Sequence, residues 1–247
     1  MNNLLALTIR EWKAFWYSSV AYIVGAVFLL LEGFGFWFLM SVLNDPRVDP
    51  TLTMSALFFG TIWYWFSILT MAPLLTMRTF SEEKRTGTIE VLMSAPVTDW
   101  QVVTAKFLGA WLSFCALWGA TFPLFLLLRR FTPIDWGPVF CGYLGTALLG
   151  AVFIAIGVLA SSLTRNQVVA GFVAFVFIIL LFSLGLLGVF VQDPDAGKMV
   201  HYFSILDHVR DFSRGILDTR PVVLYASLIA ALLLLTMRTI GNPKWRA

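Results

Sequence analysis

The sequence predicts an all-α integral membrane protein with six transmembrane helices and no separate soluble domain. Of its 247 residues, 59% are hydrophobic and 13% are charged, and the mean hydropathy is +0.84. Soluble domains carry a charge at about a quarter of their positions. Because one helical crossing of a bilayer takes roughly 20 apolar residues, six crossings leave only short connections and tails. We therefore expect residues 1–247 to form a single transmembrane domain.

The first 18 residues predict an amphipathic helix that lies at the membrane interface. Leu5, Ile9, Trp12 and Trp16 recur at i, i+4, i+7 and i+11, so they share one face of a helix. The charged side chains of residues 1–18 lie elsewhere around the same helix. An apolar face with aromatic residues beside a charged face is typical of a helix at the lipid headgroups.

Six apolar runs follow, and each is long enough to cross a bilayer. They are residues 20–43, 55–77, 107–128, 138–161, 168–191 and 221–237. The loops between them contain the turn-forming residues. In the fourth run, Ala147, Ala151 and Ala155 recur every four residues beside glycines, a pattern that favours close packing of helices.

Lysine and arginine are more frequent on the side of the membrane that carries both termini. With six spans, ten of these residues lie on that side and seven on the other, and positive charge favours the cytoplasmic side. We therefore expect both termini in the cytoplasm, although the pair Arg129 and Arg130 opposes this orientation.

The sequence excludes several classes of function. It contains no G-x-x-x-x-G-K-[ST] phosphate loop and no H-E-x-x-H, G-x-S-x-G or C-x-x-C motif, so we expect neither enzymatic activity nor a cofactor or metal bound by this chain. The basic residues form no block suited to nucleic acid. Cys115 and Cys141 lie in apolar runs and are expected to be buried. His201 and His208 lack further ligands at metal spacing, and we expect them to be solvated.

Residues 78–106, between the second and third spans, predict a short helix followed by a turn and a new helix. Glu82 and Glu83 suit a helix N-terminus, and the apolar positions that follow recur at i, i+3 and i+4: Ile89, Leu92 and Met93. A proline ends this helix, and Thr98 and Gln101 have the spacing of a capping box. A solvated connection and a docking surface for a cytoplasmic partner both fit this pattern.

This segment resembles ABC-2 type transporter permeases. The resemblance rests on residues 82–90 (EEKRTGTIE), 95–97 (APV) and 106–109 (KFLG), and it is strongest to the subgroup with the gliding-motility permease and the permease of nitrous oxide reductase maturation. In that family the segment forms a coupling helix that sits in a cleft of a separate cytoplasmic ATPase. The resemblance therefore implies an ATPase-docking role for eight residues: Glu82, Glu83, Lys84, Arg85, Gly87, Thr88, Glu90 and Leu92.

The resemblance also implies a function for the whole chain. It would be the permease subunit of an ATP-driven ABC transporter of the type V exporter architecture, in the bacterial cytoplasmic (inner) membrane, and most such permeases are exporters. ATP and Mg²⁺ would be bound by the partner ATPase. A second permease copy would complete a homodimer or heterodimer in the lipid bilayer, and a periplasmic accessory protein would be a further partner. The alternative hypothesis is a membrane scaffold that recruits an ATPase or periplasmic partner without moving substrate.

Residues 192–220 predict an amphipathic helix on the outer side, before the last span. Ile205, Val209, Phe212 and Ile216 line one face, and charged residues line another. The resemblance implies short helices here that close the outer end of the transport pathway.

Glu32 lies near the middle of the first predicted span. An ionised carboxylate at this depth is costly unless it is paired or hydrated. We expect Glu32 to face the interior of the bundle or to stay protonated. It is a candidate for the transport pathway, and a structural hydrogen bond is the alternative.

Overall fold

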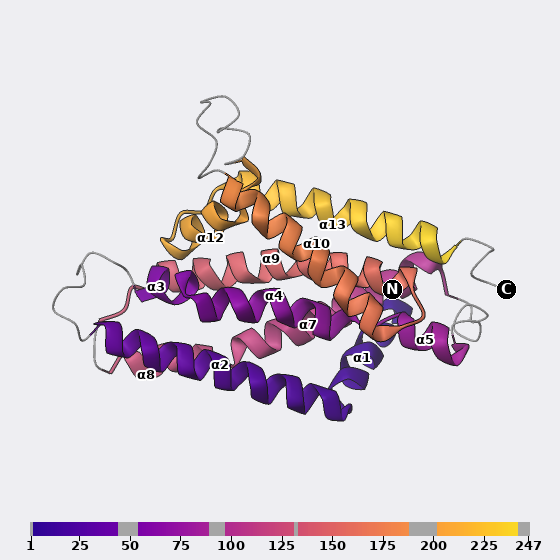
Figure 1. Ribbon diagram of the computed structural model, residues 1–247, viewed down its shortest axis with the longest axis horizontal. Helices are drawn as coiled ribbons and strands as arrows, with labels where there is room; N and C mark the ends of the chain where they lie inside the picture. The colour runs from indigo at the N-terminus through magenta and orange to yellow at the C-terminus, as the bar shows by residue number, and fades with distance from the viewer. Residues whose placement is uncertain (1, 44–53, 89–96, 131–132, 188–201, 242–247) are drawn as a thin grey trace.

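The apolar runs of the sequence form long helices that lie side by side along one axis (Figure 1). The computed structural model describes residues 2–43, 54–88, 97–130, 133–187 and 202–241. Every regular element in these ranges is an α-helix. The helices are α1 (Asn2–Trp16), α2 (Ser19–Leu43), α3 (Met54–Gly60), α4 (Ile62–Thr76), α5 (Ser81–Thr86), α7 (Asp99–Gly119), α8 (Phe122–Leu128), α9 (Trp136–Leu163), α10 (Gln167–Leu187), α12 (Ile205–Ser213) and α13 (Thr219–Ile240).

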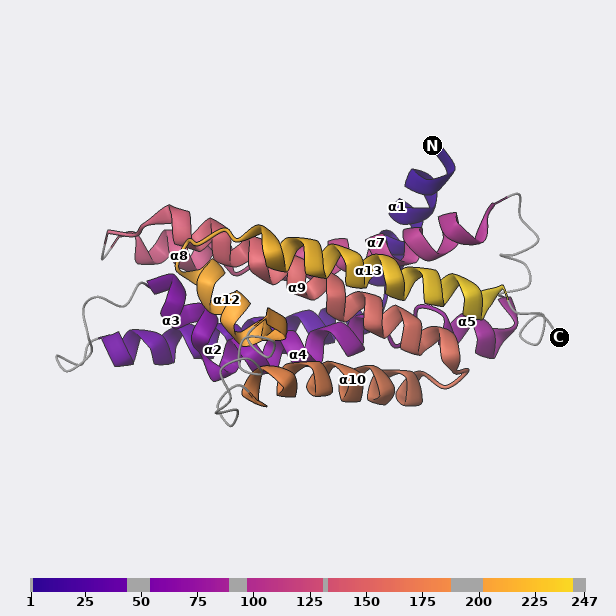
Figure 2. The same cartoon turned by 90° about the horizontal axis from the view of Figure 1, so that it is seen from above.

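The short helices gather at the two ends of the bundle. Figures 1 and 2 both show α1 and α5 at one end, which we call the α5 end, and α3, α8 and α12 at the other, which we call the α12 end. In Figure 2, α1 runs across the direction of the long helices. This arrangement places the predicted interfacial helix and the predicted coupling segment at the same end of the molecule.

Within the described residues, five helical stretches are long and apolar enough to cross a membrane. They are α2, α7 continued by α8, α9, α10 and α13. A sixth forms only as a bent pair, in which α3 meets the stretch Ile62–Thr86 (α4 and α5) at an angle of 52°. When this pair counts as one span, the structure agrees with the six spans predicted from the sequence.

The second predicted span, residues 55–77, is wrong as a single helix. Its chain leaves helical geometry at Thr61, where φ is −69° and ψ is 153°, and the Thr61 hydroxyl accepts a hydrogen bond from the Tyr64 amide. Threonine in this role starts a new helix, because it satisfies one of the free amides of the first turn. Phe59, just before the break, packs edge-on against Tyr64 and Tyr143 in the core. The bend at Thr61 is therefore stabilised by a helix cap and by aromatic packing around Phe59.

The capping box predicted before the third span is confirmed. The Thr98 hydroxyl accepts from the Gln101 amide, and the Gln101 side chain accepts from the Thr98 amide. Because both bonds form, α7 begins at Asp99, well before the apolar run that starts at residue 107. As a result, Lys106 lies inside α7.

Helix α9 is the centre of the bundle. Of its most apolar window, 72% is buried, compared with 17% for α10. Of the predicted packing seam, Ala151 and Ala155 are buried in this helix and Ala147 is half-buried. At Gly157 a Cβ atom would lie 1.9 Å from the Thr76 hydroxyl oxygen, so α4 and α9 approach each other here as closely as their backbones allow.

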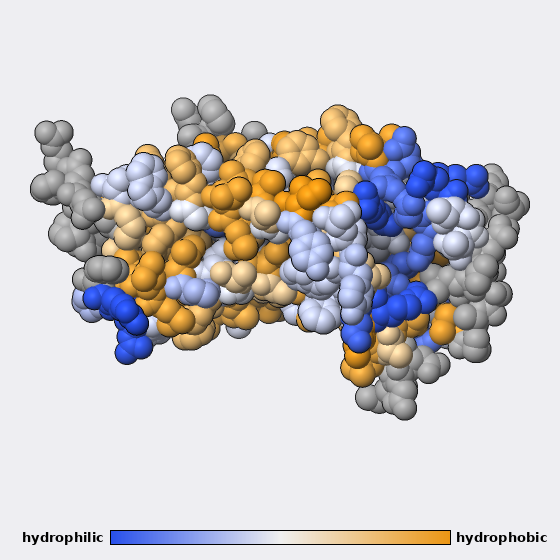
Figure 3. Space-filling model, turned by 90° about the horizontal axis from the view of Figure 1, so that it is seen from below, coloured by the Kyte–Doolittle hydropathy of each residue, from blue (hydrophilic) through white to orange (hydrophobic). Residues whose placement is uncertain are grey.

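The outer faces of several spans are apolar and exposed. Figure 3 shows hydrophobic residues over the length of the molecule, with hydrophilic residues gathered towards the α5 end. Among the exposed residues of α2 and α10 are Leu30, Trp37, Val168, Phe172 and Phe177. Apolar faces of this extent require lipid or another apolar surface around them.

Candidate functional site

The predicted coupling segment begins with α5, a helix of only six residues. Glu82 and Glu83 lie in its first turn, and Gly87 ends it with a φ of 72°. A left-handed conformation is readily adopted by glycine and strained for other residues. Because an isolated helix this short is unstable in water, contacts with the rest of the protein must hold α5 in place.

The start of α5 is held by the end of α9. The amides of Phe80 and Ser81 donate to the Ser161 hydroxyl oxygen at 3.0 and 3.1 Å, and Lys84 Nζ donates to the carbonyl of Ser162. The Ser162 hydroxyl in turn forms a hydrogen bond of 2.8 Å with Thr239 of α13. These contacts are buried or partly buried, so α5 cannot shift without disturbing the ends of α9 and α13.

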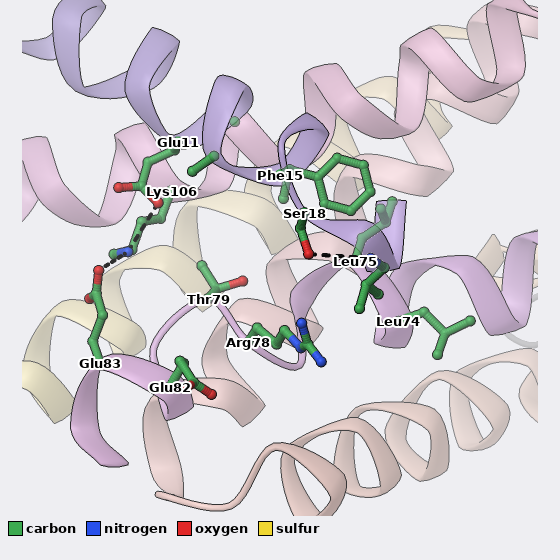
Figure 4. Close-up of a pocket in the computed structure, with 14 residues that line it drawn as sticks. Glu11, Phe15, Ser18, Leu74, Leu75, Arg78, Thr79, Glu82, Glu83 and Lys106 are labelled. Atoms are coloured by element: carbon green, nitrogen blue, oxygen red, sulfur yellow. Dashed lines mark hydrogen bonds and ion pairs between the residues drawn. The ribbon is translucent and has the colours of Figure 1, made fainter. Parts of the chain in front are cut away.

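Lys106 connects α5 to two further helices. Its ammonium lies 2.7 Å from a Glu83 oxygen of α5 and 3.1 Å from a Glu11 oxygen of α1, and its side chain is only 2% exposed. The ring centre of Phe80 is 5.2 Å away. Figure 4 shows both carboxylates turned towards this one ammonium. Removing either carboxylate from a buried ammonium lowers the stability of the fold, because the charge is then less well compensated. We call Glu11, Glu83 and Lys106 the lysine clamp.

Helix α1 lies directly against α7 at the clamp. A Cβ atom at Gly109 would lie 2.8 Å from the Glu11 Cβ atom, so only glycine permits this approach. Burial opposes ionisation of Glu11, but the nearby Lys106 ammonium and Arg10 guanidinium outweigh it and lower the pKa of Glu11 below its ordinary value. The apolar residues Leu5 and Ile9 on another face remain exposed, as expected for a helix at the membrane interface.

The predicted docking residues divide into two groups. Glu82 and Arg85 form an ion pair of 2.7 Å at the surface, and Gly87 and Thr88 are exposed. By contrast, Lys84 is buried and faces α9. Glu83 faces Lys106. Glu90 and Leu92 lie outside the described residues. The first group, which we call the outer face of α5, consists of the half-buried Glu82 and the exposed Arg85, Thr86, Gly87 and Thr88.

Sequence reasoning missed the contacts that hold α5. In the sequence, Lys106 belongs to the motif at 106–109 and Glu11 to the charged part of the first helix. Their pairing joins positions 95 residues apart, and no local pattern reports such a contact. A partial signal exists at Ser161 and Ser162, because two polar residues at the end of an apolar run are candidates to bond a neighbouring backbone.

Glu32 faces the interior of the bundle, as expected. It is 1% exposed, and the buried Ser67 of α4 lies beside it. A carboxyl group at this depth is most stable when it is shielded from lipid. Whether Glu32 contributes to a transport pathway stays a prediction.

At the α12 end, the predicted amphipathic helix forms, with two corrections. Ile205, Val209 and Phe212 are buried, but α12 ends at Ser213 and Ile216 is exposed. Gly215, with a φ of 84°, turns the chain there, so Ile216 leaves the stripe that the sequence predicted.

His208 is the second correction, because it is buried and not solvated. Its Nδ1 atom forms a hydrogen bond of 2.9 Å with the Tyr225 hydroxyl of α13. Burial lowers the pKa of His208, and the carboxylates of Asp207, Asp211 and Asp218 oppose this only in part. His201 lies outside the described residues. Within the described part of the chain, no three His, Cys, Asp or Glu side chains are placed to hold a metal ion.

A comparison with known families supplies the context for this site. The sequence model described as ABC-2 family transporter protein matches residues 6–240, which is nearly the whole chain. The chain belongs to the ABC-2 transporter family. This permease is therefore a multi-pass membrane component of an ABC transporter. The family implies an ABC ATPase as a separate partner, so the permease itself is not the ATPase. No curated protein matches the chain.

Proposed function

We propose that this permease is driven by a separate cytoplasmic ATPase that docks on residues 80–95. The observation that carries the proposal is the division of α5 into two sides. Its outer face presents Arg85, Thr86 and Thr88 to solvent, and its inner side is bonded to α9 and to the lysine clamp. A segment that transmits motion from a partner to the spans needs one side to contact the partner and another side to contact the spans.

Motion of α5 would reach the spans through these inner contacts. Ser161 transmits it to α9, and Lys106 transmits it to α7 and α1. Packed helices joined in this way shift as units between a few discrete arrangements. We infer an inward-facing and an outward-facing arrangement, and export as the direction of transport.

The same proposal covers the assembly and its location. Two permease copies, identical or related, would flank the pathway, which accords with the exposed apolar faces of α2 and α10. The α5 end would lie in the cytoplasm of a bacterium, both termini would be cytoplasmic, and the bundle would lie in the inner membrane. The motifs at 82–90 and 95–97 support membership of the gliding-motility and nitrous-oxide-reductase-maturation subgroup.

The docking role can be tested by reversing one charge on the outer face of α5. Arg85→Glu should lower the permease-dependent ATPase activity of the reconstituted complex several-fold, because charged contacts at an interface set its register. Arg214→Glu is the matched control, since Arg214 is also exposed but follows α12 at the opposite end. Equal ATPase activity in the wild type and Arg85→Glu would contradict docking at α5.

The orientation can be tested in a variant without native cysteines. After Cys115→Ser and Cys141→Ser, a single Thr88→Cys substitution should react with a membrane-impermeant maleimide only from the cytoplasmic side. Reaction from the outer side would overturn the orientation. In the same vesicles, substrate movement that requires hydrolysable ATP supports the transporter, whereas ATPase recruitment without any movement would favour the scaffold.

A further inference from the structure

A cavity of about 320 Å³ lies at the α5 end, where α1, α4, α5 and α7 meet. Its volume is at the lower end of the range for small-molecule sites, roughly 300–1,000 Å³. Figure 4 shows the lysine clamp on one side of this cavity and Leu74 and Leu75 on another. The cavity thus adjoins the proposed coupling segment, but the transport proposal assigns it no role.

One wall of the cavity is apolar. Figure 4 shows Phe15, Leu74 and Leu75 on this side, and Val20 and Ala110 also line the cavity. Leu74 is 40% exposed on the surface of α4, which is a candidate membrane span in the bent pair. The apolar wall is therefore continuous with a surface that lipid chains would contact.

The opposite wall carries charge and unused acceptors. Glu82 Oε2 and Glu83 Oε2 are both buried and have no hydrogen-bond partner among the described residues. Arg78 is exposed, and its Nε atom donates to Gln167 at 2.9 Å. Arg78 and Glu82 both line the cavity, and Figure 4 labels them. Buried carboxylate oxygens are costly unless a donor reaches them.

The charges lining the cavity favour a ligand that carries a cation and an anion together. The lining includes three carboxylates and two cations, Glu11, Glu82, Glu83, Arg78 and Lys106, so it disfavours a ligand with net negative charge. An ammonium group with N–H donors can bond the unused Glu82 oxygen, and a phosphate can bond the guanidinium of Arg78. The apolar wall suits acyl chains.

We propose that this cavity binds the headgroup of an aminophospholipid, a primary ammonium linked to a phosphodiester. The ammonium donates to Glu82, the phosphate accepts from Arg78, and the acyl chains lie along the wall that contains Leu74. A choline headgroup has no N–H donor and cannot bond the unused Glu82 oxygen. This inference does not depend on the transport function, because binding can be measured on the permease alone.

The test measures lipid binding to the purified full-length permease by native mass spectrometry. The probes are short-chain phosphatidylethanolamine, phosphatidylcholine and phosphatidylglycerol, with water-soluble phosphoethanolamine to separate the headgroup from the lipid. We expect phosphatidylethanolamine to bind about tenfold more tightly than the other two lipids, which corresponds to one charge-assisted hydrogen bond. Phosphoethanolamine should bind more weakly than the lipid, because it lacks the acyl chains.

Three variants locate the site. Glu82→Gln should abolish the preference for phosphatidylethanolamine, and Arg78→Gln should weaken ethanolamine and choline lipids alike. Arg85→Gln is the control, because it breaks the same Glu82–Arg85 ion pair but leaves the Glu82 carboxylate in place, and it should keep the preference. Equal binding of the three lipids to the wild type, or an unchanged preference in Glu82→Gln, would overturn the proposal. Phosphoethanolamine binding as tightly as the lipid would overturn the role of the apolar wall.

Discussion

Removing either carboxylate of the lysine clamp should destabilise the α5 end. The Lys106 ammonium lies 2.7 Å from Glu83 and 3.1 Å from Glu11. At an effective dielectric constant of about 20, these distances give attractions of about 6 and about 5 kcal/mol. Desolvation of the ammonium offsets much of this, and breaking a fully buried pair costs about 3–5 kcal/mol. Since both carboxylates are partly exposed and one remains in each variant, we expect Glu83→Gln and Glu11→Gln each to lower the unfolding free energy by about 2 kcal/mol.

The two substitutions should not be additive. Glu11→Gln leaves the ammonium with Glu83, and Glu83→Gln leaves it with Glu11, but the double variant leaves a buried charge with neither. We therefore expect the double variant to lose about 1–2 kcal/mol more than the sum of the single losses. Adding Lys106→Met removes the buried charge, so it should recover much of the lost stability.

The measurement is denaturant-induced unfolding of the purified permease in mixed micelles. Arg85→Gln is the matched control, because it removes the surface ion pair with Glu82 on the same helix and should cost less stability than either clamp variant. The reasoning would be refuted if the clamp variants lost no more stability than this control. It would equally be refuted if Lys106→Met lowered the stability of the double variant further.

Three other perturbations have defined outcomes. Ser161→Ala removes the acceptor of two backbone amides and should lower the unfolding free energy by about 1–3 kcal/mol. Gly157→Ala places a methyl group against Thr76 and should cost about 1–3 kcal/mol, visible as a lower thermal midpoint. The folded-state pKa of His208 lies below its ordinary value. The contribution of His208 to the unfolding free energy is therefore fully present above about pH 6.5. It is lost as the pH falls further, because the unfolded state then binds the proton more readily than the folded state. His208→Gln should remove that part of the pH dependence of unfolding.

The spans were predictable because their signal is local. An apolar run of sufficient length needs no knowledge of its neighbours, and the capping box at Thr98 and Gln101 lies within four residues. The break at Thr61 was not predictable in this way. A single threonine inside an apolar run is compatible with a continuous helix, and only the aromatic packing around Phe59 shows why the chain bends there.

The candidate site was predictable in position but not in construction. Its place between the second and third spans followed from sequence motifs, whereas its inner contacts join distant positions such as Ser161 and Phe80. His208 illustrates the same limit. An amphipathic pattern assigns a histidine to the polar face, but a partner on another helix, Tyr225, makes a buried position favourable.

The size of α5 makes a final test of coupling possible. Six residues cannot form a stable helix alone, so the outer face of α5 is positioned by Ser161 and by the lysine clamp. Ser161 never faces a partner, since it lies buried in α9. If α5 transmits motion, Ser161→Ala should reduce permease-dependent ATPase activity while the ATPase still binds, whereas Arg85→Glu should reduce both. Loss of ATPase binding in both variants would mean that α5 is only a docking surface. The contacts with Ser161 would then be needed to keep α5 folded for binding, and they would not transmit motion.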